Sequence, residues 1–254
     1  MTKTLVIQSH RSPLPADWLS LCIDSVKTWA SQHGFDYRFI DDQLFDYVSA
    51  DILDRTKQQR VIATDLARLK AIQDSLNQDY DSVVWCDADF LIFNPQQFLL
   101  PETPYALGRE VWIQENTSNP KKLSVHTKVH NAFLMFRKGN LFLDFYTDTA
   151  ERLLLINQGP VPPQFIGPKL LTALHNIAQC PVLETAGMFS PLVIQAIAHG
   201  EGPALSLFNQ HSPKPPYAAN LCHSLNQQGE CSNEEIDRCI TTLLSKKTLP
   251  ACAA

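Results

Sequence analysis

The sequence has no long hydrophobic run. No stretch approaches the roughly 18 consecutive apolar residues that a membrane-spanning helix needs. Near the N-terminus the apolar run is only Leu5-Val6-Ile7, which is too short for the hydrophobic region of a signal peptide. Cys252 stands third from the C-terminus rather than fourth, so a prenylation motif is also missing. We therefore expect a cytoplasmic protein without a membrane span.

The sequence also lacks a basic stripe. Its formal net charge is −5 at pH 7, whereas a domain that binds nucleic acid normally gathers Lys and Arg on one face. Lys121-Lys122 and Lys246-Lys247 are isolated pairs, as solvated surfaces commonly have. Nucleic acid is therefore not expected as a main partner.

Cysteines spaced as zinc ligands are a third absence. The chain has 7 cysteines, an odd number that cannot pair completely within one chain. The four nearest the C-terminus show no C-x2-C spacing. Free thiols are the favoured interpretation, with a disulfide or a structural zinc site in the tail as alternatives. These four are Cys222, Cys231, Cys239 and Cys252.

The first forty residues predict a nucleotide-binding type of sheet. Residues 4–9 form an apolar, β-branched strand, residues 16–33 repeat apolar side chains at helical spacing, and residues 35–40 form a second strand. A strand–helix–strand unit implies a parallel sheet, and ligands bind at the carboxyl ends of such strands. Asp41 or Asp42, just after the second strand, would meet the ribose of a nucleotide, or would merely begin a turn.

Residues 61–78 predict an amphipathic helix with a polar pair beside its apolar stripe. Ile62, Leu66 and Leu69 begin the stripe at 3.6-residue spacing. Asp65 and Arg68 lie one helical turn apart next to it. From the helix alone, this pair is interpreted as a surface ion pair that contributes only a few tenths of a kcal/mol.

Two aspartates interrupt the most apolar stretch of the chain. Residues 83–93, VVWCDADFLIF, predict a buried central strand that carries Asp87 and Asp89. A buried carboxylate without a partner is unfavourable by several kcal/mol or becomes neutral. Carboxylate oxygens at the end of a strand are ligands for Mg²⁺ or Mn²⁺, and a phosphate commonly completes the coordination. The pair therefore predicts a cation site that binds a phosphorylated ligand.

The remaining chain predicts further elements of an α/β fold. Short strands are expected at residues 105–108 and 130–139, and helices at residues 141–158 and 167–179. VLETA, residues 182–186, and ALSLF, residues 204–208, are expected as late strands.

Several of these segments resemble GT-A glycosyltransferases. YDSVVWCDADFLIFNP is similar to their metal-binding D-x-D segment, most closely in family 34, and HNAFLMFRKGNLFLDFY is similar to a later segment of that family. ATDLARLKAI resembles the A-S-D-x-x-R helix of family 32 and of the large clostridial glucosylating toxins, and IGPKLLTAL resembles a family 32 segment. The likeness covers roughly residues 61–180. Gln78-Asp79 replaces a Gly-Gly of family 32, and Ala132 replaces a Gly of family 34, so the donor sugar does not carry over.

The resemblance implies a GT-A fold, with a mainly parallel central sheet flanked by helices. Residues 1–254 would form a single glycosyltransferase domain. Residues 1–100 would be its nucleotide-sugar-binding half, residues 101–225 its acceptor-side half, and residues 226–254 a C-terminal helical tail.

The resemblance also implies roles for individual residues. Asp87 and Asp89 would hold Mn²⁺, or else Mg²⁺, with His223 as the third ligand and His211 as its rival. The reaction would be a hexosyl transfer from a nucleotide diphosphate sugar, with retention of anomeric configuration, as in families 8, 32 and 34. The expected catalytic residues are Arg68, Asp89 and Asn131, and the expected donor-binding residues are Asp41, Asp65, Arg68, Asp87 and Lys169.

Three other interpretations compete with parts of this assignment. Lys169 would meet a phosphate at a helix N-terminus, or it would be an ordinary solvated lysine. A sugar nucleotidyltransferase also combines a parallel sheet with a metal, but the loop after the first strand, SHRSPLPADW, has no glycine. A non-catalytic GT-A-like protein that binds a nucleotide or a glycan is the remaining alternative. The acceptor is open between glycan, lipid, small molecule and protein.

Overall fold

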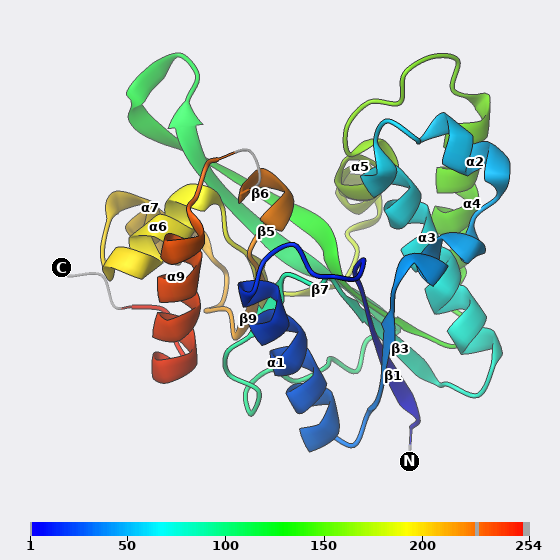
Figure 1. Ribbon diagram of the computed structural model, residues 1–254, viewed down its shortest axis with the longest axis horizontal. Helices are drawn as coiled ribbons and strands as arrows, with labels where there is room; N and C mark the ends of the chain where they lie inside the picture. The colour runs from blue at the N-terminus through cyan, green and yellow to red at the C-terminus, as the bar shows by residue number, and fades with distance from the viewer. Residues whose placement is uncertain (1, 227–228, 251–254) are drawn as a thin grey trace.

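The protein is an α/β structure built on a six-stranded mixed sheet (Figure 1). The computed structural model describes residues 2–226 and 229–250. Five strands of the sheet run in one direction and β6 runs against them, which confirms the mainly parallel sheet expected from the sequence. Across the sheet the order is β2 (Asp36–Ile40), β1 (Thr4–Ser9), β3 (Ser82–Cys86), β6 (Asn119–Arg137), β5 (Tyr105–Asn116) and β7 (Val182–Leu183).

A second, three-stranded sheet follows the D-x-D segment. Its central strand is β9 (Ala218–Asn220), which pairs antiparallel with β4 (Phe90–Ile92) and parallel with β8 (Ala186–Met188). The single strand expected at residues 83–93 is therefore wrong, because β3 and β4 belong to different sheets. The chain changes sheet at Asp87–Asp89, which places both carboxylates at a turn between two buried strands.

Helices cover both faces of the main sheet because its central strands are apolar on both sides. In β3, Val83 and Trp85 pack into the core beneath α3 (Arg60–Asn77) and α4 (Leu141–Ile156). Val84 and Cys86 point the opposite way, toward α1 (Trp18–Gln32). This pattern is typical of strands buried on two faces. The remaining helices are α2 (Ala50–Arg55), α5 (Leu170–Ala178), α6 (Pro191–His199), α7 (Pro203–His211), α8 (His223–Asn226) and α9 (Asn233–Lys246), with a 3₁₀ helix at Asp42–Tyr47 and a π-helical turn at Phe165–Lys169.

Strands β5 and β6 form a long hairpin that projects from the sheet, at the upper left of Figure 1. The sequence predicted only residues 105–108 and 130–139 as strands, whereas pairing continues to Asn116 and Asn119 at the hairpin tip. A bulge between Leu107 and Gly108 shifts the register at the base of the hairpin. Gly108 lies there directly against the ring of buried His130, which leaves no room for a β-carbon.

The prediction of a strand at residues 204–208 is also wrong. This segment lies in α7, which begins with Pro203 at its first turn after Gly202. Ala204, Leu205 and Phe208 share the buried side of that helix, and their spacing of i, i+1 and i+4 fits a helix rather than a strand with one buried face. The helix expected near the C-terminus is present as α9, with a capping box between Ser232 and Glu235.

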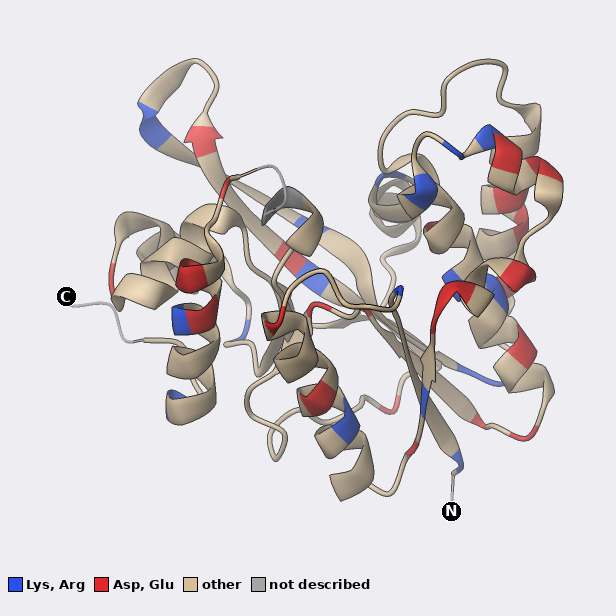
Figure 2. Cartoon of the chain, in the orientation of Figure 1, with Lys and Arg blue, Asp and Glu red and all other residues tan. Residues whose placement is uncertain are grey.

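Acidic positions gather on α2, α3 and α4, with Lys and Arg interspersed among them (Figure 2). Among the described residues, no helix is both long enough and apolar enough to cross a membrane. Cys222, Cys231 and Cys239 are free thiols, in agreement with the favoured interpretation, and Cys252 lies outside the described residues.

Candidate active site

The D-x-D turn lies at the carboxyl end of the parallel strands, where the sequence placed a ligand site. Its backbone is fixed from both neighbouring strands. The amide N–H of Asp87 donates to the carbonyl of Ala132 at 2.8 Å, and Nε2 of Gln8 donates to the carbonyl of Asp87 at 3.1 Å. Asp87 is thus fixed at the rim of the sheet by hydrogen bonds to β1 and β6.

Arg68 of α3 connects two of the acidic residues. One guanidinium nitrogen lies 3.0 Å from Oδ1 of Asp87, and the other lies 3.2 Å from Oδ1 of Asp65. The side chain of Arg68 is only 5% exposed, so the interpretation of Asp65 and Arg68 as a surface ion pair is wrong. Breaking a buried pair leaves an uncompensated charge, so removing one partner here destabilises the fold far more than removing one partner of a solvated pair.

Asn131 of β6 closes the same network. Its side-chain amide donates to Oδ1 of Asp65 at 2.8 Å, and its backbone carbonyl accepts from Arg68 at 2.7 Å. The structure therefore brings together four residues that the sequence separated by up to 66 positions, namely Asp65, Arg68, Asp87 and Asn131.

The guanidinium keeps part of its hydrogen-bonding capacity. Arg68 carries five N–H donors, and among the described residues its side chain makes one hydrogen bond, to the carbonyl of Asn131, and two ion pairs, with Asp65 and Asp87. Its Nε is buried and has no hydrogen-bond partner among the described residues. Burial lowers the pKa of Arg68, but the carboxylates of Asp87 and Asp65 outweigh it and raise that pKa. Arg68 is therefore a permanent cation with donors to spare.

Asp89 is bound on the opposite side of the turn. Its two oxygens accept hydrogen bonds from the side chain of Asn220, at 2.6 Å, and from the backbone N–H of His223, at 2.7 Å. Burial, and then the neighbouring Asp87, raise the pKa of Asp89 to about 6. Asn220 was not predicted, since a single Asn after a short apolar run carries no recognisable signal.

Burial also raises the pKa of Asp65 to about 6, although Arg68 and Asn131 act in the opposite direction. Gly167, in the π-helical turn before α5, brings backbone against the carboxylate of Asp65 and the amide of Asn131. A β-carbon at this position would displace both groups. The G-P-K segment noticed in the sequence is thus part of the wall around Asp65.

Of the other predicted site residues, some line the cavities at the turn and others do not. Asp41 lines a cavity next to the turn, and its carboxylate also caps the following 3₁₀ helix by accepting from the N–H of Gln43. Lys169 is exposed and does not line either cavity of the site, so the phosphate role assigned to it is not supported. His211 lies at the end of α7 and is absent from the lining as well.

His223 lies beside the turn, but its ring packs edge-on against Trp18, with 5.3 Å between ring centroids. Within residues 2–226 and 229–250, no three His, Cys, Asp or Glu side chains form a group that could hold a metal ion. The expected triad of Asp87, Asp89 and His223 is therefore not assembled in this structure.

The remaining donor set still suits a hard divalent cation. The hydrogen bond from Trp85 and the ion pair with Arg68 both involve Oδ1 of Asp87, and Oδ2 has no partner in the described part of the chain. Asp89 supplies a second carboxylate at the same turn. Mg²⁺ in enzymes commonly takes one or two carboxylates and completes its shell with phosphate and water. Two carboxylates without a third protein ligand match that pattern.

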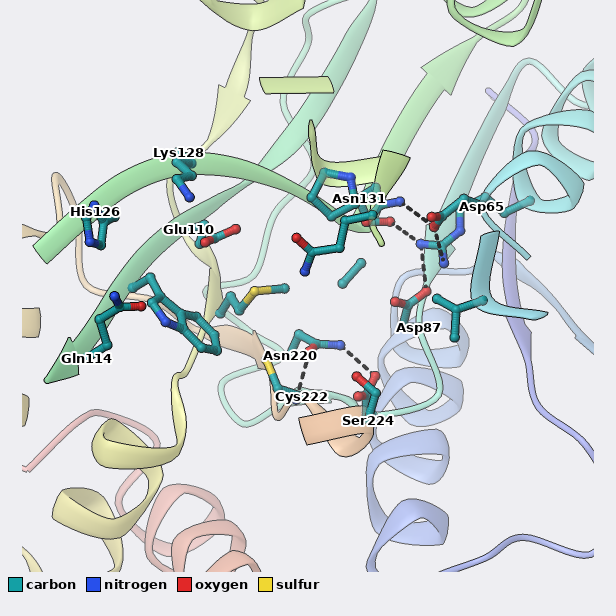
Figure 3. A pocket seen from close by; sticks show the side chains of 18 residues that line it. Asp65, Asp87, Glu110, Gln114, His126, Lys128, Asn131, Asn220, Cys222 and Ser224 are labelled. Carbon is teal, nitrogen blue, oxygen red and sulfur yellow. Dashed lines mark hydrogen bonds and ion pairs between the residues drawn. The ribbon is translucent and has the colours of Figure 1, made fainter. Parts of the chain in front are cut away.

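Two cavities meet at the D-x-D turn. One, of about 510 Å³, extends toward the β5–β6 hairpin, and the other, of about 750 Å³, extends toward the ends of β1 and β2. Both are lined by Arg68, Asp87 and Asp89. In Figure 3 the acidic network of Asp65 and Asp87 stands at one end of the first cavity, and Glu110, Gln114, His126 and Lys128 stand at the other.

Glu110 of β5 is the acidic group at the hairpin end. Burial raises its pKa to about 7, although Lys128 on the adjacent strand lowers it. No ion pair within 4.0 Å joins Glu110 to Lys128 or to any other described residue.

The pKa of Glu110 predicts a pH-dependent stability. Because the folded pKa lies above the unfolded one, the unfolded chain loses this proton first, and stability is lost as pH rises from about 4.5 to about 7. Replacing Glu110 by Gln should remove that loss and raise the free energy of unfolding by about 1–3 kcal/mol at pH 8. Urea unfolding of the original protein and of Glu110→Gln, at pH 8 and at pH 4, measures the difference in the free energy of unfolding. The gain should vanish at pH 4, and an equal gain at both pH values would contradict the assignment.

Comparisons with known proteins give only distant likenesses. No family model and no curated protein matches the sequence. A glycosyltransferase involved in glycosylation of the major capsid of PBCV-1 aligns with 89% of this chain and 98% of its own, at 11% identity and a TM-score of 0.47. The galactosyltransferase LgtC, in complex with donor and acceptor sugar analogs, aligns with 86% of this chain and 87% of its own, at 14% identity and a TM-score of 0.41.

A third likeness is to the apo form of the glycosyltransferase GlyE of Streptococcus pneumoniae, with 99% of this chain and 65% of that one aligned at 12% identity and a TM-score of 0.40. Scores below 0.5 at such identities do not establish a family or an activity. The functional assignment therefore depends on the geometry of the site.

Proposed function

We propose that the protein is a glycosyltransferase that moves a hexosyl group from a nucleoside diphosphate sugar to an acceptor hydroxyl. The observation that carries this proposal is the position of Arg68. It is a buried cation that forms ion pairs with Asp65 and Asp87 and lines both cavities. A diphosphate bound at this wall would join a nucleotide in one cavity to a sugar in the other. Residues 1–100 and 101–225 would then serve as the donor and acceptor halves of one domain.

The charges of the site explain why a cation is part of the proposal. Asp65, Asp87 and Asp89 oppose the single guanidinium of Arg68, so the cluster carries a formal charge of −2 when all are ionised. A diphosphate would be repelled by this excess. Asp87 and Asp89 would hold Mn²⁺ or Mg²⁺, which when bound neutralises the phosphates and acts as a Lewis acid on the leaving group.

Each residue of the network has a defined task in this proposal. The free donors of Arg68 bind a phosphate oxygen and stabilise the charge that develops as the sugar departs. Asp65, oriented by Asn131, accepts a hydroxyl of the donor sugar and fixes the ring. Asn220 holds the carboxylate of Asp89 in place. Asp41 lies in the larger cavity, where the ribose would sit.

The proposal is tested by measuring donor hydrolysis for a panel of nucleotide sugars, with Mn²⁺, with Mg²⁺ and with chelator. We expect slow release of nucleoside diphosphate from one donor, dependent on the cation, together with a thermal shift for that donor. A panel without turnover but with tight binding would instead favour a non-catalytic nucleotide-binding protein. Pyrophosphate-dependent formation of a sugar 1-phosphate would favour a nucleotidyltransferase.

We also propose that the anomeric configuration of the sugar is retained, because the sequence resembles families 8, 32 and 34. The anomeric form of the product, read by NMR, decides it.

A further inference from the structure

The β5–β6 hairpin has two chemically different faces. Val111 and Ile113 of β5 are buried against the core formed with α6, α7 and α9. Successive side chains of a strand alternate between faces, so the intervening residues of β5 point away from that core. They line the 510 Å³ cavity instead, together with two of their three cross-strand partners in β6.

The cavity face of the hairpin combines one aromatic ring with several hydrogen-bonding groups. Glu110 stands opposite Lys128, Trp112 opposite His126, and Gln114 opposite Ser124. Of these six residues, all except Ser124 line the cavity.

Trp112 has no structural task that explains its position. It is only partly buried and lies on the polar face of the hairpin, away from the core that holds Val111 and Ile113. Among the described residues, neither its indole N–H nor the carboxylate of Glu110 has a hydrogen-bond partner. A flat apolar ring beside polar groups that make no hydrogen bond within the described protein is the arrangement of a binding surface rather than of a core.

Taking the proposed glycosyltransferase function as given, we propose that the acceptor is a carbohydrate whose ring lies on the indole of Trp112. The apolar C–H face of a sugar matches the aromatic ring, and its hydroxyls match Glu110, Gln114 and Lys128. A lipid tail would leave these polar groups unsatisfied. A protein acceptor would have to extend a side-chain hydroxyl along the cavity, from Glu110 and Lys128 at one end to the acidic network at the other.

The arrangement also sets the direction of transfer. The bound acceptor presents a hydroxyl toward Asp65 and Asp87, at the opposite end of the cavity from the hairpin (Figure 3). The hydroxyl oxygen forms the new bond to the anomeric carbon, and the bond from that carbon to the diphosphate breaks. The electron pair leaves with the nucleoside diphosphate, which also receives the hydroxyl proton.

The test uses the full chain, the donor found by the hydrolysis panel, and a panel of mono- and oligosaccharide acceptors beside a hydroxylated lipid and a Ser/Thr peptide. At least one sugar should stimulate donor consumption. Trp112→Ala should raise the KM of that sugar about tenfold or more, while the KM of the donor changes less than twofold. Trp112→Phe should restore most of the acceptor affinity, which a merely structural change would not predict.

Lys122→Ala, at the exposed hairpin tip, is the matched control and should leave both KM values unchanged. Stimulation by the lipid or the peptide alone would overturn the proposal. A sugar acceptor whose KM is insensitive to Trp112→Ala would overturn it as well. Absence of any donor hydrolysis would overturn the proposed function itself, a result distinct from both.

Discussion

Replacing Asp89 by Asn is expected to lower donor turnover by roughly a hundredfold or more, because a cation at the D-x-D turn would lose one of its two carboxylates. Both carboxylate oxygens of Asp89 are held in place, one by Asn220 and the other by the N–H of His223. A neutral amide there keeps the shape of the side chain and removes its charge. Turnover is measured with saturating donor and Mn²⁺, and binding of Mn²⁺ is measured separately.

The same variant should remain folded. Ionised Asp89 destabilises the empty protein at neutral pH, because burial raises its pKa to about 6. Asn removes that penalty and loses one of two hydrogen bonds, worth about 1 kcal/mol, so the free energy of unfolding should change by no more than about 1–2 kcal/mol. Asp79→Asn in the exposed D-x-D of the Asp79-Tyr80-Asp81 turn is the matched control and should be silent in both measurements. Unchanged turnover in Asp89→Asn would remove the D-x-D from the mechanism.

The sequence predicted the class of the fold and its opening elements, and it directed attention to the D-x-D turn. The opening strand–helix–strand unit and the helix at residues 61–78 agree with β1, α1, β2 and α3 within a few residues. These elements have long, regular patterns that local chemistry decides. The D-x-D predicted a site because two carboxylates inside an apolar stretch need partners, and the structure supplies them through Arg68, Trp85, Asn220 and the backbone N–H of His223.

The errors arose where pairing between distant segments decides the structure. Residues 83–93 are apolar on both sides of Asp87 and Asp89, so nothing local shows that the chain changes sheet there and pairs with β9, about 130 residues later. The sequence predicted a hairpin that is too short, because the outer half of β5 and β6 is polar on one face. Val111 and Ile113 nevertheless alternate with Trp112, as the residues of a half-buried strand should. Asn220 and the wall at Gly167 became recognisable only from the tertiary contacts.

The interpretation of Asp65 and Arg68 illustrates the same limit in energetic terms. A helix alone shows that they are one turn apart, and an exposed pair at this spacing contributes little. Burial by β3 and β6 changes the magnitude, because Arg68 then compensates two carboxylates rather than one. This difference is large enough to be measured directly.

Replacing Arg68 by Ala is expected to lower the free energy of unfolding by about 3–5 kcal/mol, because it leaves Asp65 and Asp87 buried without their counter-charge. An exposed ion pair would give a much smaller loss of unfolding free energy. Urea denaturation at pH 7 measures this free energy. Arg152→Ala is the control: Arg152 also pairs within one helix, with Asp148 at 3.9 Å, but its side chain is 75% exposed. That variant should change stability by less than about 0.5 kcal/mol.

Arg68→Lys separates the role of Arg68 in folding from its role in catalysis. Lysine restores the positive charge, so it should recover a good part of the stability lost in Arg68→Ala. It lacks the planar fork that meets Asp65, Asp87 and the carbonyl of Asn131 at once and still reaches a phosphate. Donor turnover should therefore stay at least about tenfold below that of the original protein in a variant that is folded at the assay temperature. If Arg68→Lys restores stability and turnover together, Arg68 acts only as a structural counter-ion, and the leaving-group charge must be stabilised by another group that lines the cavities, such as Arg11 or Arg60.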